Sequence, residues 1–144
     1  MKNISVVGGL GLSLAQADVR DFHNAMGIPA PDFPSSLGPR HYLRARLIDE
    51  ECKEFEEAAE KGDTLEMIDA LCDIIYVALG SAVEMGVDLA PFWTEVQKAN
   101  MAKAGGPVRE DGKIMKPPGW KPPDHATVWG TAYGNTPIPH TTTD

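Results

Sequence analysis

The chain has 144 residues, of which 42% are apolar and 24% charged, and this composition is typical of a globular domain. Cys52 and Cys72 are too few for a disulfide framework and form no Cys-x-x-Cys zinc pair, so we expect them to be small core residues. No apolar run approaches the ~18 residues of a transmembrane helix. Because glycines interrupt the apolar residues 4–14, a signal peptide is not indicated either, and we expect a cytoplasmic protein.

The formal net charge of −8 is concentrated in one segment. Residues 49–73 contain eleven acidic residues and two basic ones, whereas the rest of the chain is almost neutral. Acidity focused in this way indicates a bound cation. There is no basic stripe that could neutralise the phosphates of duplex DNA, so neither a nucleic acid nor a membrane is the expected partner.

The N-terminal part of the chain predicts little regular structure before residue 17. Residues 1–16 are weakly apolar and rich in glycine, so we expect an irregular N-terminal arm. Residues 17–26 predict a short helix that ends at Gly27. Three prolines between residues 29 and 34 then predict an extended connector.

Two long helices follow the connector. Leu43, Leu47, Ile48 and Phe55 recur at helical spacing, which predicts a helix over about residues 41–61 that ends at Gly62. The next helix is predicted over about residues 64–85, with Asp63 as its N-cap and Glu66 completing a capping-box pattern. Its middle is apolar nearly all round, so we expect this helix to be central and surrounded by others.

The C-terminal third is predicted to be less regular. A fourth helix over about residues 90–103 would turn Phe92, Val96 and Met101 inward. A turn at Asp111-Gly112 and a proline-rich segment follow, and residues 126–144 predict an extended tail. Because nothing alternates with period two, the expected fold is all-α: a bundle of four or five helices with an irregular C-terminal extension.

Acidic residues mark the two long helices as the site of chemistry. Asp69 and Asp73 share one face of the apolar helix, and burying two like charges is costly unless a cation compensates them. On the preceding helix Glu51 occupies the apolar stripe. Antiparallel packing through the turn at Gly62 would set five carboxylates opposite one another, whereas the other glutamates of that helix are expected to be solvated. The first set is Glu50, Glu51, Glu54, Asp69 and Asp73, and the second is Glu56, Glu57 and Glu60.

Carboxylates without His or Cys suit hard divalent cations such as Mg²⁺ or Mn²⁺. A di-iron bundle is not indicated, because no histidine follows a glutamate by three positions. Hard cations held by carboxylates with open coordination positions usually bind phosphate oxygens. The residues therefore predict a metal site that acts on a phosphate.

The motif Leu47-Ile48-x-Glu50-Glu51-x-x-Glu54, followed by Asp69-Ala-Leu-Cys-Asp73-x-x-Tyr76, resembles the all-α NTP pyrophosphohydrolases of the MazG-like superfamily. Phe22-His23, Asn100-Met-x-Lys103 and the segment Glu110–Asp124 resemble its single-domain phage and bacterial branch, and extend the likeness over a domain of residues 17–125. One departure is that Ala70 stands where the superfamily's Glu-x-x-Asp pattern has a carboxylate. Asp69, or else Glu66 one turn earlier, would have to supply that ligand.

The resemblance implies a MazG-like bundle completed by oligomerisation, as a homodimer or homotetramer, in the host cytoplasm if the protein is phage-encoded. It also implies hydrolysis of a nucleoside triphosphate between the α- and β-phosphates. Two or three Mg²⁺ or Mn²⁺ ions would be held by the five carboxylates Glu50, Glu51, Glu54, Asp69 and Asp73. Glu50 or Glu51 would orient or deprotonate the attacking water.

The resemblance further implies which residues contact the substrate. Asn100 and Lys103, with Lys116 or Lys121, would bind the outer phosphates. Trp120 would cap the base pocket or only pin its segment, and Phe22 and His23 would line the base pocket or only pack in the core. The phage-like features suggest purine deoxynucleotides such as dGTP. The alternatives are an all-α dUTPase- or dUDPase-like house-cleaning enzyme and a non-catalytic helical interaction module.

Overall fold

The computed structural model describes the backbone of residues 4–140 and the side chains from residue 8 onward. The described part is helical, with five α-helices, one short 3-10 helix and no strand beyond a single isolated bridge. It forms two compact units, the first made of residues 4–13 and 89–136 and the second of residues 14–88 and 137–140. None of the described helices is both long enough and apolar enough to cross a bilayer.

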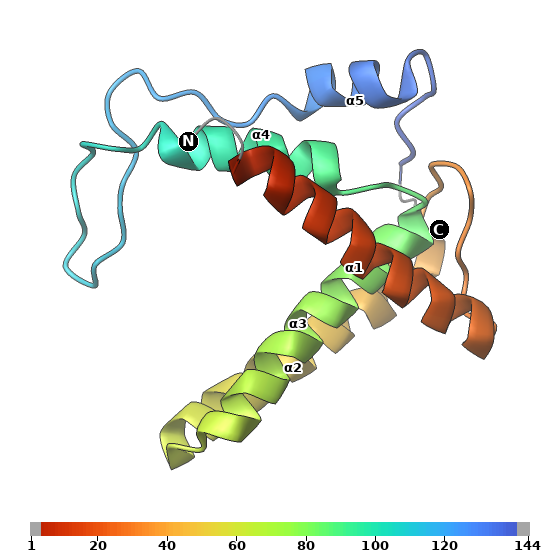
Figure 1. Ribbon diagram of the computed structural model, residues 1–144, viewed down its shortest axis with the longest axis horizontal. Helices are drawn as coiled ribbons and strands as arrows, with labels where there is room; N and C mark the ends of the chain where they lie inside the picture. Colours follow the sequence, from red (N-terminus) through yellow and green to blue (C-terminus); the bar gives the residue numbers. More distant parts are fainter. Residues whose placement is uncertain (1–3, 141–144) are drawn as a thin grey trace. The chain divides into compact units, whose positions relative to one another are not determined.

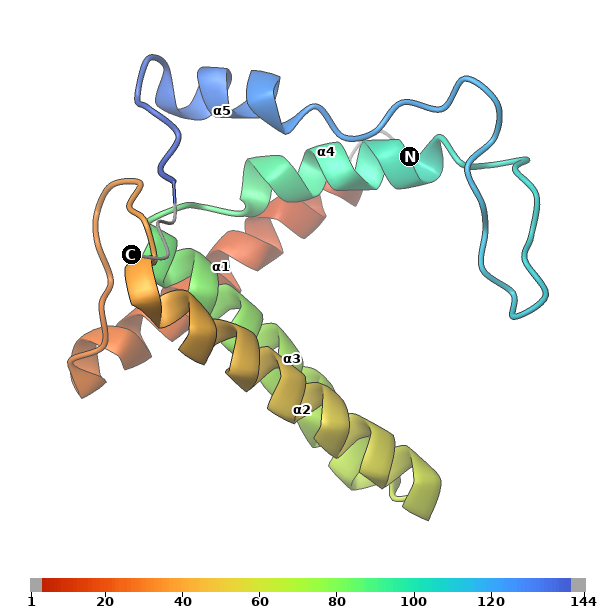
Figure 2. The ribbon, with the colours of Figure 1, turned by 180° about the vertical axis from the view of Figure 1, so that it is seen from behind.

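The second unit is built on an antiparallel hairpin of two helices, α2 (His41–Lys61) and α3 (Thr64–Met85), which lie side by side along their length (Figure 1, Figure 2). Gly62 ends α2 in the left-handed conformation, with φ of 68°. Asp63 then caps α3 by accepting a hydrogen bond of 3.1 Å from the backbone N–H of Glu66. The predicted bounds of both helices and this cap are confirmed.

Helix α1 (Ile4–Met26) corrects the prediction of an irregular N-terminal arm, because the chain is helical from residue 4. The glycines that argued against a helix have a packing role in the first unit. A Cβ built on Gly8 would lie 3.1 Å from the indole nitrogen of Trp93, and one on Gly9 would lie 3.4 Å from the hydroxyl of Thr94. Glycine therefore lets the helix backbone approach these side chains closely.

The connector after α1 folds back over the end of α3 within the second unit. The N–H of Ser35 donates to the carbonyl of Met85 at 2.8 Å, and the short helix η1 (Gly38–Arg40) leads into α2. Around this end of α3 lies the apolar core of the unit, in which each side chain is at most 6% exposed: Val19, Leu79, Ala82, Val83 and Val87.

The other half of α3 is less covered than the sequence predicted. Leu65, Ile68, Leu71 and Ile75 are between 47% and 77% exposed in this chain, so the helix is not surrounded along its whole length. Cys52 and Cys72 are also exposed, which corrects their assignment as core residues. The apolar residues of α3 exceed what α2 alone can bury.

The first unit contains α4 (Ala90–Met101) and α5 (His125–Tyr133), joined by a turn-rich segment. Helix α5 corrects the prediction that the tail from residue 126 is extended. Asp124 caps it, since its carboxylate accepts bonds from the backbone N–H and the hydroxyl of Thr127, at 3.1 and 2.7 Å. Met101 is 61% exposed and does not point inward as predicted.

Candidate metal centre

The seam between α2 and α3 follows a spacing of seven residues on α2. Arg44 and Ala58 are buried there, and Glu51, halfway between them, is partly buried. Positions seven apart lie on one face of a helix, so Glu51 occupies a position where a core residue is expected. This is the helical face from which the sequence predicted a metal ligand.

Three carboxylates meet at this point of the seam. Oxygen atoms of Glu51 and Glu54 on α2 and of Asp73 on α3 all lie within 4.8 Å of one another. Glu51 and Asp73 are partly buried, whereas Glu54 is exposed. The group, called the carboxylate cluster below, therefore has one side closed by the helices and one side open to solvent.

Within the cluster, the ionised form of Glu51 is electrostatically unfavourable. Burial raises the pKa of its carboxyl group, and the neighbouring charges of Glu54 and Asp73 raise it further. Its Oε2 atom is buried and has no hydrogen-bond partner. A buried acceptor without a partner is unfavourable, so the charged form of Glu51 needs a positive group at this place.

The donor set fits a hard divalent cation. The cluster offers carboxylate oxygens alone, which suits Mg²⁺ or Mn²⁺ rather than zinc or copper. The buried Oε2 of Glu51 has no hydrogen-bond partner and is therefore available as a metal ligand. Glu51, Glu54 and Asp73 are therefore the residues that would hold the ion, and the exposed side leaves room for further ligands.

The other predicted ligands lie outside the cluster. Glu50 and Asp69 are exposed, each close in sequence to a cluster member. Ala70, at the position of the superfamily's carboxylate, is 3% exposed. Glu66 is exposed at the start of α3, where its backbone N–H is bound by the cap. Glu56, Glu57 and Glu60 are exposed, as expected for a solvated face.

A buried ionic network lies farther along the same seam, and sequence reasoning missed it. The side chain of Glu84 is 1% exposed and is paired with both Arg40 and Arg44. The guanidinium of Arg44 also donates to the hydroxyl of Ser81 at 3.0 Å and to the carbonyl of Val77 at 2.6 Å. The sequence did contain one indication: Arg44 precedes Glu51 by seven residues, so the two lie on the same face of α2.

His23 and Phe22 differ in their exposure. His23 is 2% exposed, and its Nδ1 lies 3.0 Å from the carbonyl oxygen of Pro29, so it donates there as a core residue. Phe22 is 40% exposed and meets Tyr76 of α3 edge to face, with ring centroids 5.7 Å apart. Tyr76 follows Asp73 by almost one turn, so this aromatic pair belongs to the same unit as the cluster.

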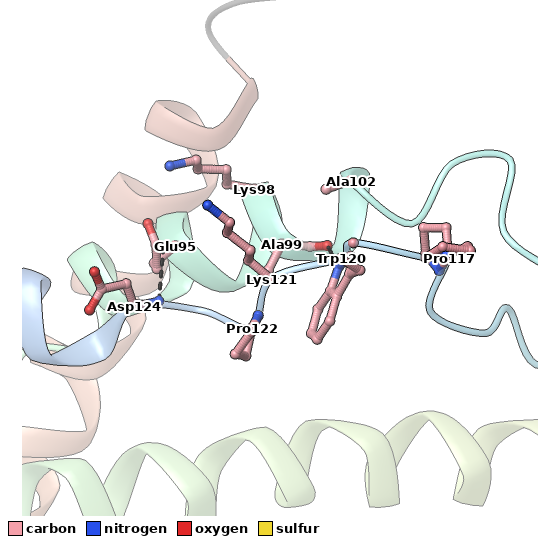
Figure 3. A pocket seen from close by; sticks show the side chains of 11 residues that line it. Glu95, Lys98, Ala99, Ala102, Pro117, Trp120, Lys121, Pro122 and Asp124 are labelled. Atoms are coloured by element: carbon pink, nitrogen blue, oxygen red, sulfur yellow. Dashed lines mark hydrogen bonds between the residues drawn. The ribbon is translucent and has the colours of Figure 1, made fainter.

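Trp120 organises the basic residues of the first unit. Its indole N–H donates to the carbonyl of Ala99 at 2.7 Å, which pins the proline-rich segment to α4 (Figure 3). The ammonium groups of Lys103 and Lys116 lie 5.2 and 4.9 Å from its ring centroid, within the range of a cation–π interaction. Lys103 also donates to the side-chain oxygen of Asn100 at 3.0 Å.

A pocket of about 470 Å³ lies between α4 and the segment 117–124 (Figure 3). Lys98, Lys121 and Trp120 line it, and Glu95 accepts a hydrogen bond of 3.0 Å from the backbone N–H of Asp124 at its edge. Of the predicted substrate contacts, Lys103 and Lys116 thus lie over the ring of Trp120. Asn100 accepts a hydrogen bond from Lys103, and Lys121 lines the adjoining pocket.

A comparison with known protein families matches the part of the chain that contains this site. Residues 19–100 match the phosphoribosyl-ATP pyrophosphohydrolase family, and this range covers more than half of the 144 residues. It includes α2, α3 and all three residues of the carboxylate cluster. Comparison with the curated proteins found no match. The family is typically dependent on divalent metal, which fits an acidic cluster. The chain therefore belongs to the phosphoribosyl-ATP pyrophosphohydrolase family, a member of the all-α MazG-like superfamily of nucleotide pyrophosphohydrolases.

Proposed function

We propose that the chain is a metal-dependent nucleoside triphosphate pyrophosphohydrolase, which cleaves (d)NTP between the α- and β-phosphates to the monophosphate and pyrophosphate. The observation that carries the proposal is the cluster of Glu51, Glu54 and Asp73, with its buried unpartnered oxygen, in a chain of this family. Three carboxylates this close need a cation, and a phosphate-bound cation fits the open side.

The residues of the second unit have distinct proposed roles. Glu51, Glu54 and Asp73 hold the ion, with Glu50 and Asp69 as flanking carboxylates. Bound Mg²⁺ or Mn²⁺ neutralises phosphate charge and lowers the pKa of a coordinated water. Glu50 is exposed beside the cluster, which leaves it free to take a proton from the attacking water. The two or three ions per site that the resemblance implies are to be counted by titration.

Basic residues around Trp120 are the proposed phosphate contacts. Two observations support this role: the side chains are positively charged, and the structure holds them close together. Lys103 and Lys116 lie over one tryptophan ring, and Lys121 lines the neighbouring pocket. Asn100, which accepts a bond from Lys103, would orient that lysine. Trp120 is proposed to pin the segment, because its indole N–H is already used on Ala99. Phe22 is the proposed wall for the base, since His23 is buried.

For the substrate we propose a purine deoxynucleotide such as dGTP. Phosphoribosyl-ATP, named by the matching family, and dUTP, the substrate of the all-α dUTPases, are the alternatives. All three offer the cluster a chain of phosphates, so the choice depends on contacts to the base and sugar.

One assay tests the reaction. Pyrophosphate release is measured for the eight common NTPs and dNTPs, dUTP and phosphoribosyl-ATP, with Mn²⁺, with Mg²⁺ and with chelator, and the products are separated by ion exchange. We expect metal-dependent formation of monophosphate and pyrophosphate. Diphosphate with orthophosphate would contradict cleavage between the α- and β-phosphates. A lack of turnover, with a melting temperature indifferent to millimolar metal, would favour the interaction module.

A further inference from the structure

Arg44 ties α2 to α3 at a point two turns from the carboxylate cluster. Its side chain is 7% exposed, and each guanidinium nitrogen has a partner on α3. Nε donates to Ser81 at 3.0 Å, Nη2 to the carbonyl of Val77 at 2.6 Å, and Nη1 lies 3.0 Å from Glu84. A planar fork with three partners fixes both the position and the rotation of the helix that carries it.

The turn at Gly62 and Asp63 joins the two helices at one end, but between this turn and Arg44 the seam has no large side chain that is fully buried. Its fully buried members nearest the turn are Ala58 and Ala70, at 5% and 3% exposure, whose methyl groups resist sliding weakly. The cluster itself repels, since its three carboxylates lie within 4.8 Å. A shift of one residue moves a side chain by about 1.5 Å along a helix and 100° around it. Such a shift would separate Glu51 from Asp73.

We propose that Arg44 is a positioning residue for the cluster: its bonds to Val77, Ser81 and Glu84 hold the register of α2 on α3 that brings Glu51 and Glu54 to Asp73. The inference rests on the proposed function only in taking this cluster to be the metal site. Arg44 acts through geometry, because its Cα lies about 10 Å from that of Glu51 along the helix, near the screening length of about 10 Å at 0.1 M salt.

The register can be measured directly with the native cysteines. Cys52 and Cys72 are the two cysteines of the chain, both are exposed, and each is next to a cluster residue. Nitroxide labels on both, in protein diluted with unlabelled chain and without metal, report the distance between α2 and α3 by dipolar electron paramagnetic resonance. We expect a narrow distribution in the wild type and a broadened or displaced one in Arg44→Met.

Metal affinity provides the second measurement, with an arginine of the same unit as the matched control. Arg20 donates to the carbonyls of Ala30 and Pro31 at 3.0 and 3.3 Å and lies outside the seam. By calorimetry on unlabelled protein, Arg44→Met should weaken Mn²⁺ binding at least ~10-fold, the scale of losses for residues that orient ligands. Arg44→Lys should recover part of that loss, and Arg20→Met should bind within about twofold of the wild type.

The outcomes separate this inference from the proposed function. Wild-type distances together with wild-type Mn²⁺ affinity in Arg44→Met would overturn it, and so would an equal loss of affinity in Arg20→Met, because that loss would reflect stability alone. If Arg44→Met does not fold, Ser81→Ala removes only the Nε partner and should broaden the distances to a smaller degree; an unchanged distribution there overturns the inference as well. A wild type that binds no Mn²⁺ contradicts the proposed function, whereas a broadened distribution in Arg44→Met still supports the role of Arg44.

Discussion

Glu51 is the residue at which stability and proposed function oppose each other. Because burial and its acidic neighbours raise the pKa of this carboxyl group in the folded state, folding favours its protonated form. The stability that it contributes is therefore complete below the unfolded pKa of 4.5 and is lost as the pH rises through the folded value. At neutral pH and without metal, the ionised Glu51 destabilises the protein.

Glu51→Gln should separate the two effects. Without metal at pH 7.5 the variant should melt about 2–5 °C higher than the wild type, and this gain should shrink towards pH 4, where Glu51 is protonated in both states. Turnover should fall at least ~100-fold, because a ligand has been removed. Thermal melts in chelator at both pH values and the pyrophosphate assay check this. A variant that is less stable at pH 7.5 would show that Glu51 is already compensated.

Asp69 and Asp73 test which aspartate belongs to the cluster. Asp73→Asn should weaken Mn²⁺ binding at least ~100-fold, because Asp73 supplies an oxygen within 4.8 Å of the others. Asp69 is exposed about one turn, or 5.4 Å, away along α3. Asp69→Asn should therefore weaken Mn²⁺ binding by at most ~10-fold, because it removes only the electrostatic attraction of a nearby negative charge. Calorimetric titration ranks the two, and the reverse ranking would make Asp69 the ligand that replaces the family carboxylate.

The sequence predicted which two helices carry the site, but not which of their carboxylates come together. Glu51 could be identified because a charge on an apolar stripe is unusual, and Asp73 because α3 has few charges in its middle. Which of Asp69 and Asp73 turns towards Glu51 depends on the rotation of α3 against α2. Long-range contacts such as those of Arg44 with Ser81 and Glu84 set that rotation, and a helical repeat does not reveal them.

At the scale of the helices, Gly80 permits the close approach of two buried side chains to α3. A Cβ at this position would clash with the guanidinium of Arg44 and would lie 3.0 Å from Nε2 of His23. Helix propensity alone predicts that Gly→Ala stabilises an internal helical position by about 1 kcal/mol. Here overpacking, which typically costs about 1–3 kcal/mol, should exceed that gain because Arg44 is held by three partners.

Gly80→Ala should therefore lower the free energy of unfolding by about 1–2 kcal/mol, as measured by urea denaturation. Gly11→Ala in α1 is the matched control, because a Cβ there meets no described atom within 4 Å. It should leave stability unchanged or raise it by up to about 1 kcal/mol. Gly80→Ala as stable as the control would mean that Arg44 can move away freely, which would also weaken the case for its positioning role.

The helices with clear capping residues at their ends were the ones whose bounds the sequence predicted correctly. The bounds of α2 and α3 were predictable because Gly62, Asp63 and Gly86 are strong stop and start signals. The start of α1 was missed because glycine lowers helix propensity, and its compensating contacts come from α4, about 85 residues later in the chain. Helix α5 was missed because it is short and rich in Thr and Val, although Asp124 and Thr127 form a recognisable cap.

At the scale of the whole molecule, charge is divided between the two units. Among the described residues, the first unit holds six basic and four acidic ones, whereas the second unit combines six basic with sixteen acidic ones. The acidity of the chain therefore lies in the unit that holds the carboxylate cluster, where it favours a bound cation.

The exposed apolar side chains of α3 lead to a prediction about assembly. Ile68, Leu71 and Ile75 lie on the face of α3 opposite Asp73, and covering one such side chain contributes about 1.5–3 kcal/mol. We therefore expect a homodimer or a larger homo-oligomer that buries this face, as measured by sedimentation. The double variant Ile68→Ser/Ile75→Ser should dissociate at least ~100-fold more readily, while Phe33→Ser, a 69% exposed residue of the connector, should leave assembly unchanged. Because the substitutions are uncharged and face away from the cluster, Mn²⁺ affinity separates loss of assembly from loss of the site. A wild type that sediments as a monomer at about 100 µM would contradict this prediction, because the apolar face of α3 would then remain exposed to solvent.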